Sequence, residues 1–202
     1  ISLKKPVAVW LKIDTGMHRL GIDPNDAKRA YQRLAANKNI LKPLKLMTHF
    51  ASADEKSALA SSNTAKQFEL FNSSLAGCPG LKSIANSAVI LTKPSWQLDW
   101  IRPGILLYGI SSLADKTGVE LGLKPVMTLK SRIIAIKELK KDDLVGYGGT
   151  YRCPADMPVG VVAIGYGDGY PRLAEASAPV LIDGGLCPTI GRVSMDLISV
   201  DL

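Results

Sequence analysis

A strand–helix–strand pattern runs through the stretch VAVWLKIDTGMHRLGIDPNDAKRAYQRLAANKNILKPLKLMTHF, residues 7–50. Residues 7–13 and 44–50 are short apolar runs rich in residues that favour β-strands. Between them, residues 24–39 place apolar side chains at helical spacing, and Asp23 stands where a helix cap is expected, with Pro24 in the first turn. Two strands joined by a helix are typical of a parallel β/α unit.

The same alternation continues to about residue 115. We expect a second helix from Asp54 to about Leu75, a strand that ends near Asn86, and a further strand over residues 101–110. A complete (β/α)8 barrel takes about 250 residues, whereas this region supplies about four units. The pattern therefore predicts an α/β fold, the C-terminal half of a TIM-like barrel, in a chain that is a segment of a longer protein.

The second part of the sequence has β-branched runs and no convincing helix. The runs cover residues 126–139, 160–165, 180–182, 189–195 and 197–202. Turn sequences rich in aspartate and glycine separate them, as short antiparallel strands require. We therefore expect a partial barrel domain over residues 1–118 and a partial, all-β antiparallel domain over residues 119–202.

The composition is that of an ordinary globular protein, with 47% hydrophobic and 21% charged residues. The net charge is +7, but lysine and arginine are spread along the chain, which favours a solvated basic surface over nucleic-acid binding. No run approaches the ~20 apolar residues of a membrane span. The three scattered cysteines, Cys78, Cys153 and Cys187, argue against a disulfide framework and against a zinc site, so we expect no metal and a cytoplasmic protein.

Polar residues stand at the ends of the expected parallel strands, where β/α barrels build their active sites. They are Lys12, Asp14, Thr15, Gly16 and Arg19 after the first strand, His49 after the second, Asn86 and Ser87 after the third, and Arg102 and Gly104 at the start of the fourth. Taken singly, several have a structural explanation: an edge-strand lysine, a satisfied histidine, a helix cap. Met195 alone is more typical of a core position. Together the strand-end residues predict a functional site.

The run GYGDGYPR, residues 165–172, places Tyr166 between two glycines directly after an apolar strand. Glycine at such a point indicates unusual backbone angles or the close approach of another group. Two interpretations stay open on local evidence. The run is a hairpin turn with tyrosines on its flank, or it presents the Tyr166 hydroxyl to a ligand.

Seven segments in order resemble alanine racemase, a pyridoxal-phosphate enzyme of fold type III. The segments are WLKIDTGMHRLGI, THFASADE, IANSA, RPGILLYG, VGYGGTYR, AIGYGDGYPR and GRVSMDL. The resemblance implies a β/α barrel followed by a β domain, pyridoxal 5'-phosphate as cofactor, and alanine as substrate. It also implies a cytoplasmic homodimer whose active site is shared between subunits, supplying D-alanine for peptidoglycan.

The resemblance also implies roles for individual residues. Tyr166 matches the base that takes the α-proton of L-alanine and reaches into the partner's barrel, and its flanking glycines leave room for that partner. Arg102 faces the pyridine nitrogen of the cofactor, and His49 supports the tyrosine. Arg19 lies near the substrate carboxylate, Lys12 is often carbamylated and steadies that arginine, and Met195 contributes its backbone from the partner subunit. Cofactor contacts fall to Asn86, Ser87, Gly104 and Ile105.

The sequence lacks two features of the family: the Schiff-base lysine and a later tyrosine that contacts the phosphate. The lysine that holds the cofactor as a Schiff base lies in a K-A-N-A-Y-G-like motif, which this sequence lacks. We therefore expect the segment alone to be inactive, because one of the two bases is missing. Alternatives are a racemase with another or broader amino-acid range, a non-catalytic pyridoxal-phosphate barrel protein, and a fold-type III decarboxylase. Residues 124–202 argue against the second, and GYGDGYPR is not typical of the third.

Overall fold

The computed structural model describes residues 5–174 and 178–202. The chain divides into two compact units, Ile1–Thr128 and Leu129–Leu202. A domain boundary between residues 118 and 119, as expected from the sequence, stays a prediction. Among the described residues, every helix is too short or too polar to cross a membrane.

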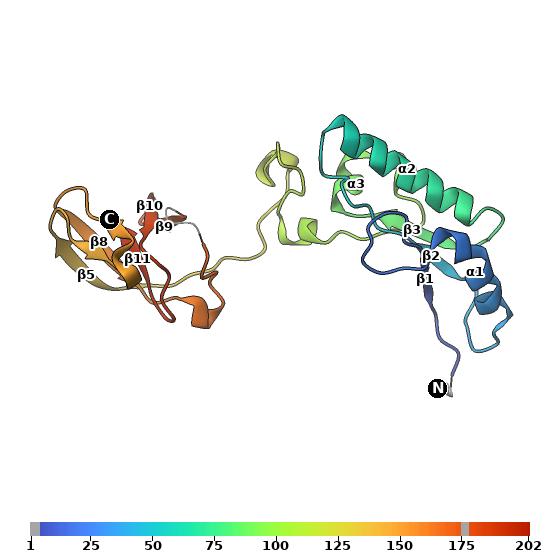
Figure 1. The fold of residues 1–202 in the computed structure, drawn as a ribbon, viewed down its shortest axis with the longest axis horizontal. Helices are drawn as coiled ribbons and strands as arrows, with labels where there is room; N and C mark the ends of the chain where they lie inside the picture. Colours follow the sequence, from blue (N-terminus) through green and yellow to red (C-terminus); the bar gives the residue numbers. More distant parts are fainter. Residues whose placement is uncertain (1–4, 175–177) are drawn as a thin grey trace. The chain divides into compact units, whose positions relative to one another are not determined.

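The first unit contains a four-stranded parallel sheet whose strands lie in sequence order. The strands are β1 (Trp10–Lys12), β2 (Lys45–Met47), β3 (Leu81–Ala85) and β4 (Trp100–Ile101). The helices are α1 (Ala27–Ala36), α2 (Ala58–Ser74) and α3 (Ser87–Thr92), and Figure 1 shows them beside the sheet. The predicted alternation of strands and helices is confirmed.

Side-chain caps determine where the helices begin. The carboxylate of Asp23 accepts the N–H of Asn25 at 2.8 Å, as predicted, and a 3-10 turn over Pro24–Asp26 leads into α1. The expectation that the second helix begins at Asp54 is wrong. The Ser57 hydroxyl accepts the N–H of Ala60 at 3.1 Å, and α2 starts only after this cap.

The hydrophobic core of this unit lies between the sheet and its helices. Leu11, Leu46 and Ile84 point from three adjacent strands toward Phe71 of α2 and Val89 of α3. Strand alternation places every second side chain on the opposite face.

On that opposite face, the rings of Trp10 and Trp100 have centroids 6.2 Å apart, with the Lys45 ammonium 5.4 and 5.1 Å from the two rings. Because β1 and β4 are three strand spacings apart, about 14 Å in a flat sheet, this convergence indicates that the sheet curls toward that face.

The strand predicted over residues 101–110 is wrong beyond Ile101. Pro103 has no N–H to donate to a ladder, and the chain turns at Gly104. Ile105–Tyr108 forms a 3-10 turn that ends at Gly109, whose φ of 78° lies in the left-handed region. The apolar run therefore belongs to a turn at the end of the sheet.

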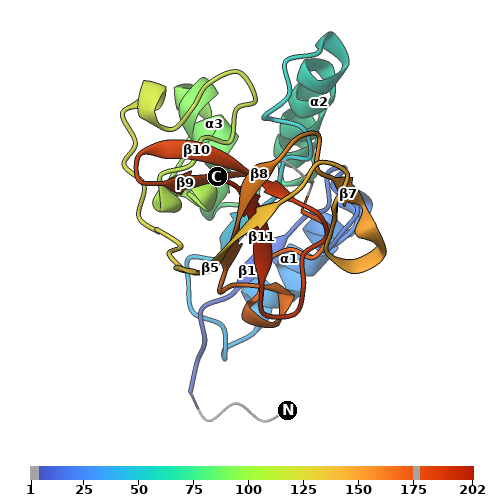
Figure 2. The same cartoon turned by 90° about the vertical axis from the view of Figure 1, so that its left-hand side faces the viewer.

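The second unit is built on an antiparallel sheet, as the sequence predicts (Figure 2). The strand order in this sheet is β5-β8-β11-β10-β9. Its strands are β5 (Ile133–Leu139), β8 (Met157–Val162), β9 (Pro179–Ile182), β10 (Gly185–Ile190) and β11 (Ile198–Asp201), and β6 (Leu144–Val145) pairs with β7 (Tyr151–Arg152). The Asp183–Gly184 turn joins β9 to β10. Buried side chains of β8 and β11, such as Val162 and Val200, form its core.

Candidate functional site

Arg102 joins the ends of three parallel strands. Its backbone N–H donates to the Ala85 carbonyl at 2.9 Å, which places the half-buried side chain directly beyond β4. Nη1 donates to the carbonyl and hydroxyl oxygens of Ser83 at 2.8 and 2.5 Å, and Nη2 donates to the Thr48 carbonyl at 2.6 Å. A guanidinium fixed by several acceptors has one defined direction.

The ring of His49 lies next to this guanidinium. Nη2 of Arg102 is 3.4 Å from Nδ1 of His49, and the histidine is half-buried. Burial, reinforced by the positive charges of Arg102, Arg19 and Lys12, lowers the pKa of His49. The imidazole is therefore neutral near pH 7. Because arginine only donates, Nδ1 must be the acceptor, which leaves the ring proton on Nε2.

The loop after β1 carries Arg19 and is organised by Asp14. Its carboxylate accepts the backbone N–H groups of Gly16, Met17 and His18 at 3.1, 3.1 and 2.9 Å. These bonds, the one from His18 above all, lower the pKa of Asp14. Arg19 itself is exposed, and Lys12 is half-buried at the end of β1. β1 and β2 are paired up to Lys12 and Met47, so these two strand ends lie side by side.

Ser87 and Gly104 meet at the ends of β3 and β4. The N–H of Gly104 donates to the Ser87 hydroxyl at 3.0 Å, and a Cβ built on Gly104 would have no closer neighbour than that hydroxyl, at 3.9 Å. Ile105 next to them is exposed. Asn86 is a helix cap, as its position alone suggested: its carboxamide oxygen accepts the N–H of Val89 at 3.1 Å at the start of α3.

Tyr166 and Met195 lie together in the second unit. Tyr166 begins a 3-10 turn over Tyr166–Asp168; its N–H donates to the Ser194 carbonyl at 3.0 Å, and the N–H of Gly167 donates to the Met195 carbonyl at 2.6 Å. Tyr166 is 41% exposed and Met195 57%, so a core role for Met195 is wrong. The guanidinium of Arg172 lies 5.3 Å from the tyrosine ring centroid.

Gly165 is required by the chain's own backbone. A Cβ there would lie 2.3 Å from the Met195 carbonyl oxygen and 2.4 Å from the Ser194 carbonyl oxygen. The Asp168 carboxylate also accepts the Gly165 N–H at 3.0 Å, which closes the turn. The expectation of a hairpin turn is wrong: the run forms a 3-10 turn, and β8 before it pairs with β5 and β11 and not with β9, the next strand along the chain. The Tyr166 side chain is left partly exposed.

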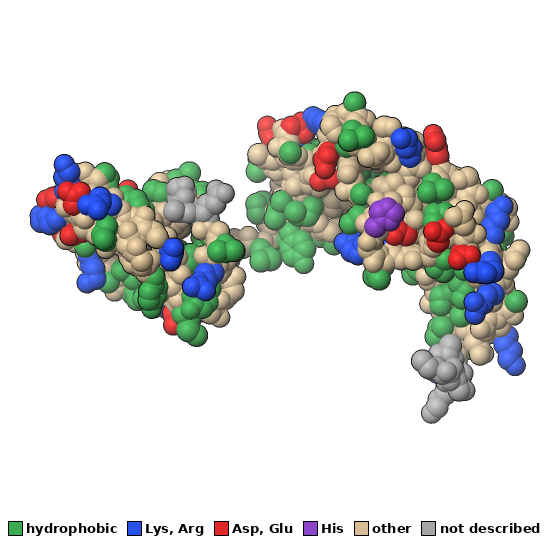
Figure 3. Space-filling view, in the orientation of Figure 1, with side chains coloured by type: hydrophobic (Ala, Val, Ile, Leu, Met, Phe, Trp, Pro, Cys, Tyr) green, Lys and Arg blue, Asp and Glu red, His purple; other side chains and the backbone are tan. Residues whose placement is uncertain are grey.

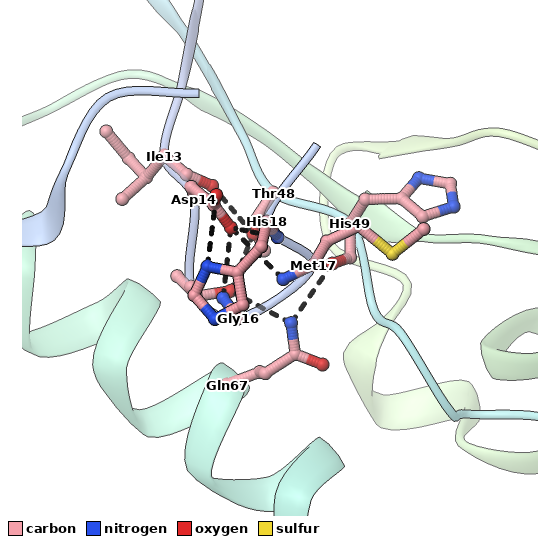
Figure 4. A network of polar contacts seen from close by, with 9 residues as sticks. Ile13, Asp14, Gly16, Met17, His18, Thr48, His49 and Gln67 are labelled. Carbon is pink, nitrogen blue, oxygen red and sulfur yellow. Dashed lines mark hydrogen bonds and ion pairs between the residues drawn. The ribbon is translucent and has the colours of Figure 1, made fainter. Parts of the chain in front are cut away.

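Three residues of the first unit were missed from the sequence: Thr48, Ser83 and Gln67. Thr15, whose hydroxyl contacts that of Thr48 at 2.7 Å, was expected only from its position after the first strand. Figure 4 shows the network that includes Thr48, His49 and Gln67. One signal was available, since the buried positions of α2 recur at 60, 64, 67 and 71, and Thr64 and Gln67 are polar. A polar residue on the buried face of a helix needs a partner.

Charged side chains show no concentration on the face seen in Figure 3, where lysine and arginine are interspersed with aspartate and glutamate.

Comparison with known proteins gives a consistent family. Sequence models of the alanine racemase N-terminal and C-terminal domains match residues 1–112 and 126–202. The chain is 52% identical over 201 residues to alanine racemase of Vibrio parahaemolyticus, covering 100% of this chain and 55% of that protein. It is 51% identical over 202 residues to biosynthetic alanine racemase of Escherichia coli K12, with the same coverage.

The crystal structure of biosynthetic alanine racemase from Pseudomonas aeruginosa matches with a TM-score of 0.92 and 44% identity, covering 99% of this chain and 55% of that one. The chain thus spans about half the length of the curated relatives it matches. On these matches, which cover both units, the chain belongs to the alanine racemase family.

Proposed function

We propose that this chain forms part of a pyridoxal-phosphate-dependent enzyme that interconverts L-alanine and D-alanine, and that it carries one of the two bases. The observation that supports this most is the contact of Arg102 with His49 at the ends of the parallel strands. It sets a neutral, proton-donating imidazole next to a fixed cation. The relatives that share this sequence are named alanine racemase.

Racemisation removes the α-proton of an amino acid from one face and returns a proton to the other. This requires two acid/base groups on opposite sides of one carbon. We assign one role to the Tyr166 oxygen. The other falls to a lysine, for which this sequence has no K-A-N-A-Y-G-like motif, so the 202-residue chain alone is expected to be inactive.

The strand-end residues fit the cofactor. The Ser87 hydroxyl accepts the Gly104 N–H and keeps its own proton to donate, and a Cβ on Gly104 would meet no atom closer than that hydroxyl at 3.9 Å, which suits the approach of a phosphate group. Within the described residues, the hydrogen bonds of the Arg102 side chain use Nη1 and Nη2, so Nε stays available to a ring nitrogen. Asn86 and Ile105 flank these groups. When bound, pyridoxal phosphate supplies an electron sink for the α-carbon.

Arg102 tunes that site by keeping its own proton. An arginine does not give up a proton near neutral pH, so Arg102 would donate a hydrogen bond from Nε to the ring nitrogen of a bound cofactor without transferring its proton. A weaker electron sink results, which disfavours side reactions such as transamination. The contacts of Arg102 with Ser83 and Thr48 hold the guanidinium for this role.

Tyr166 needs help to act as a base, because a free tyrosine has a pKa of about 10. Hydrogen bonds and positive charges that stabilise the phenolate lower the pKa of the tyrosine. We propose that the Nε2–H of His49 donates to Tyr166 of the partner subunit, with the nearby cations adding to the effect. Arg19, steadied by Lys12, binds the substrate carboxylate together with the backbone of Met195 of the partner subunit.

We further propose that β1–β4 form part of a β/α barrel and that the active protein is a homodimer. The barrel is supported by the sequential parallel strand order, by the curl of the sheet, and by β1 and β4, which are edge strands of this sheet. A cytoplasmic location and the supply of D-alanine for peptidoglycan complete the proposal.

The test uses the full-length parent protein, loaded with pyridoxal phosphate and assayed for conversion of L-alanine to D-alanine by chiral chromatography. Tyr166→Phe is expected to lower kcat about 100-fold or more, since it removes a general base. Tyr170→Phe is the matched control, because Tyr170 packs against the core of the second unit and keeps its ring. Wild-type turnover of another amino acid with none of alanine, or release of carbon dioxide from lysine or ornithine, would overturn the proposal.

A further inference from the structure

Gln67 is a buried polar residue on the core face of α2. It is 5% exposed and lies one turn from Phe71, which is fully buried. Burying an amide is costly unless its donors and acceptor find partners. The contacts of Gln67 therefore decide what it does.

The Gln67 amide contacts two strand-end segments. Nε2 donates to the His49 carbonyl at 3.2 Å and to the Thr15 hydroxyl at 3.4 Å, while Oε1 accepts the N–H of Ala51 at 3.0 Å. Its orientation is fixed, because the reverse placement would set the amide nitrogen against an N–H and the amide oxygen against a carbonyl. The side chain thus bonds the backbone on both sides of Phe50.

Proton counting gives the hydroxyl network a direction. The Thr48 hydroxyl donates its one proton to the Ile13 carbonyl at 2.9 Å. The 2.7 Å contact between the Thr15 and Thr48 hydroxyls must then run from Thr15 to Thr48. Gln67 therefore donates to Thr15, Thr15 to Thr48, and Thr48 to the end of β1, so that one chain of bonds links α2, β1 and β2 (Figure 4).

His49 is held from both directions along its backbone. Arg102 binds the carbonyl of the preceding residue, Thr48, and Gln67 binds the carbonyl of His49 itself and the N–H of Ala51. Phe50 between them is anchored in the core at 2% exposure. In Figure 4 the His49 ring points away from Gln67, so the amide sets the direction of the ring without touching it.

We propose that Gln67 is a positioning residue that holds the His49 backbone so that the imidazole faces Arg102, and that fixes this segment relative to the Thr15 loop carrying Arg19. The proposal rests on the proposed function in so far as His49 acts in the reaction. The claim that Gln67 holds the His49 backbone does not depend on the proposed function.

The test compares Gln67→Met, which keeps the volume of the side chain and removes its hydrogen bonds, with Thr64→Val. Thr64 is 1% exposed on the same helix and donates only to the Ala60 carbonyl, at 2.8 Å, so its variant loses a buried bond without touching the strand ends. Native-state amide exchange and NMR titration of His49 are measured on the 202-residue chain. The chain has two histidines, so His18→Gln assigns the signals.

In Gln67→Met, the Ala51 amide is expected to exchange about tenfold faster than in the wild type, as for loss of a buried hydrogen bond. The pKa of His49 is expected to rise toward the ordinary histidine value, because the ring leaves its buried place beside Arg102, Arg19 and Lys12. Thr64→Val is expected to leave both readouts at the wild-type value. The same Ala51 exchange and His49 titration in the two variants would overturn the proposal.

If Gln67→Met fails to fold, Gln67→Glu carries the test. The carboxylate still accepts the Ala51 N–H but cannot donate to the His49 carbonyl, so the His49 titration shifts while Ala51 stays protected; an unshifted titration overturns the proposal. In the full-length parent with cofactor, Gln67→Met is expected to lower kcat about tenfold or more with KM for alanine nearly unchanged. A wild-type kcat despite a shifted His49 titration would refute the role of Gln67 in the reaction.

The NMR measurements do not depend on enzyme activity. They therefore separate failure of the positioning role of Gln67 from failure of the racemase proposal.

Discussion

Gly165→Ala is expected to displace the turn that carries Tyr166. The φ of Gly165 is −152°, an extended value that alanine adopts freely, so the substitution carries no backbone penalty of its own. The cost is steric. The new methyl group would lie 2.3 to 2.4 Å from three backbone atoms of Ser194 and Met195, where neither partner is a flexible side chain.

The magnitude follows from what must separate. Moving the two segments apart breaks the bonds from Tyr166 to Ser194 and from Gly167 to Met195, at 3.0 and 2.6 Å. Each backbone bond is worth about 1 kcal/mol, and overpacking adds about 1 to 3 kcal/mol. We therefore expect the second unit to lose about 3 kcal/mol or more of unfolding free energy. In the full-length enzyme, kcat falls with it, because the Tyr166 ring moves with its turn.

Native-state amide exchange of Val162 and Val200, in β8 and β11, measures the loss. Tryptophan fluorescence does not report on the stability of the second unit, because the tryptophans are residues 10, 96 and 100, all in the first unit. Exchange in Gly165→Ala is expected to be about 100-fold faster than in the wild type. Gly169→Ala is the control: its φ is +91° with no atom within 4 Å, so it adds only backbone strain, about 1 to 2 kcal/mol. Exchange no faster in Gly165→Ala than in Gly169→Ala would refute this reasoning.

Two further predictions concern the first unit, each followed by tryptophan fluorescence in urea. The lowered pKa of His49 means that the unfolded chain binds a proton at higher pH than the folded chain, so acidification from about pH 8 to about pH 5 is expected to lower the unfolding free energy. His49→Asn should flatten this slope, and an equal slope in both proteins would contradict the pKa shift. Arg102→Met leaves the carbonyls of Ser83 and Thr48 without their donor and is expected to cost about 2 to 4 kcal/mol. Arg102→Lys should recover part of this loss, and a loss below about 1 kcal/mol for Arg102→Met would show that these bonds contribute little.

Local patterns allowed the order and type of most elements to be predicted. The apolar runs around Leu46 and Val200 become buried strands because burial favours apolar residues at the spacing of a strand. The same logic fails over residues 101–110. Apolar spacing alone does not distinguish a strand from a turn at the end of a sheet, and the decisive features are Pro103, which cannot donate to a ladder, and the left-handed backbone of Gly109.

The candidate site was likewise predictable from the sequence only in part. The strand-end position of His49 was predictable, because parallel strands bring their carboxyl ends to one edge. Arg102 was expected at the start of a strand over residues 101–110, whereas it lies directly beyond the end of β4. The contacts of Gln67 were not predictable, since they join residues 16 and 18 positions apart in the sequence, and one 52 apart, through a fold that local patterns do not specify. The need for glycine at position 165 likewise depends on residues 194–195, which approach it only in the folded unit.

The central claim is that Tyr166 of one subunit acts in the site that Arg102 of another subunit helps to build. Co-expression of full-length Arg102→Leu and Tyr166→Phe proteins tests it most directly, because neither variant alone has a complete site. If the site is shared, mixed dimers contain one site with both changes and one with none, so racemase activity is expected to return to about a quarter of the wild-type value. Activity of the mixture no higher than that of the separate variants would contradict the claim.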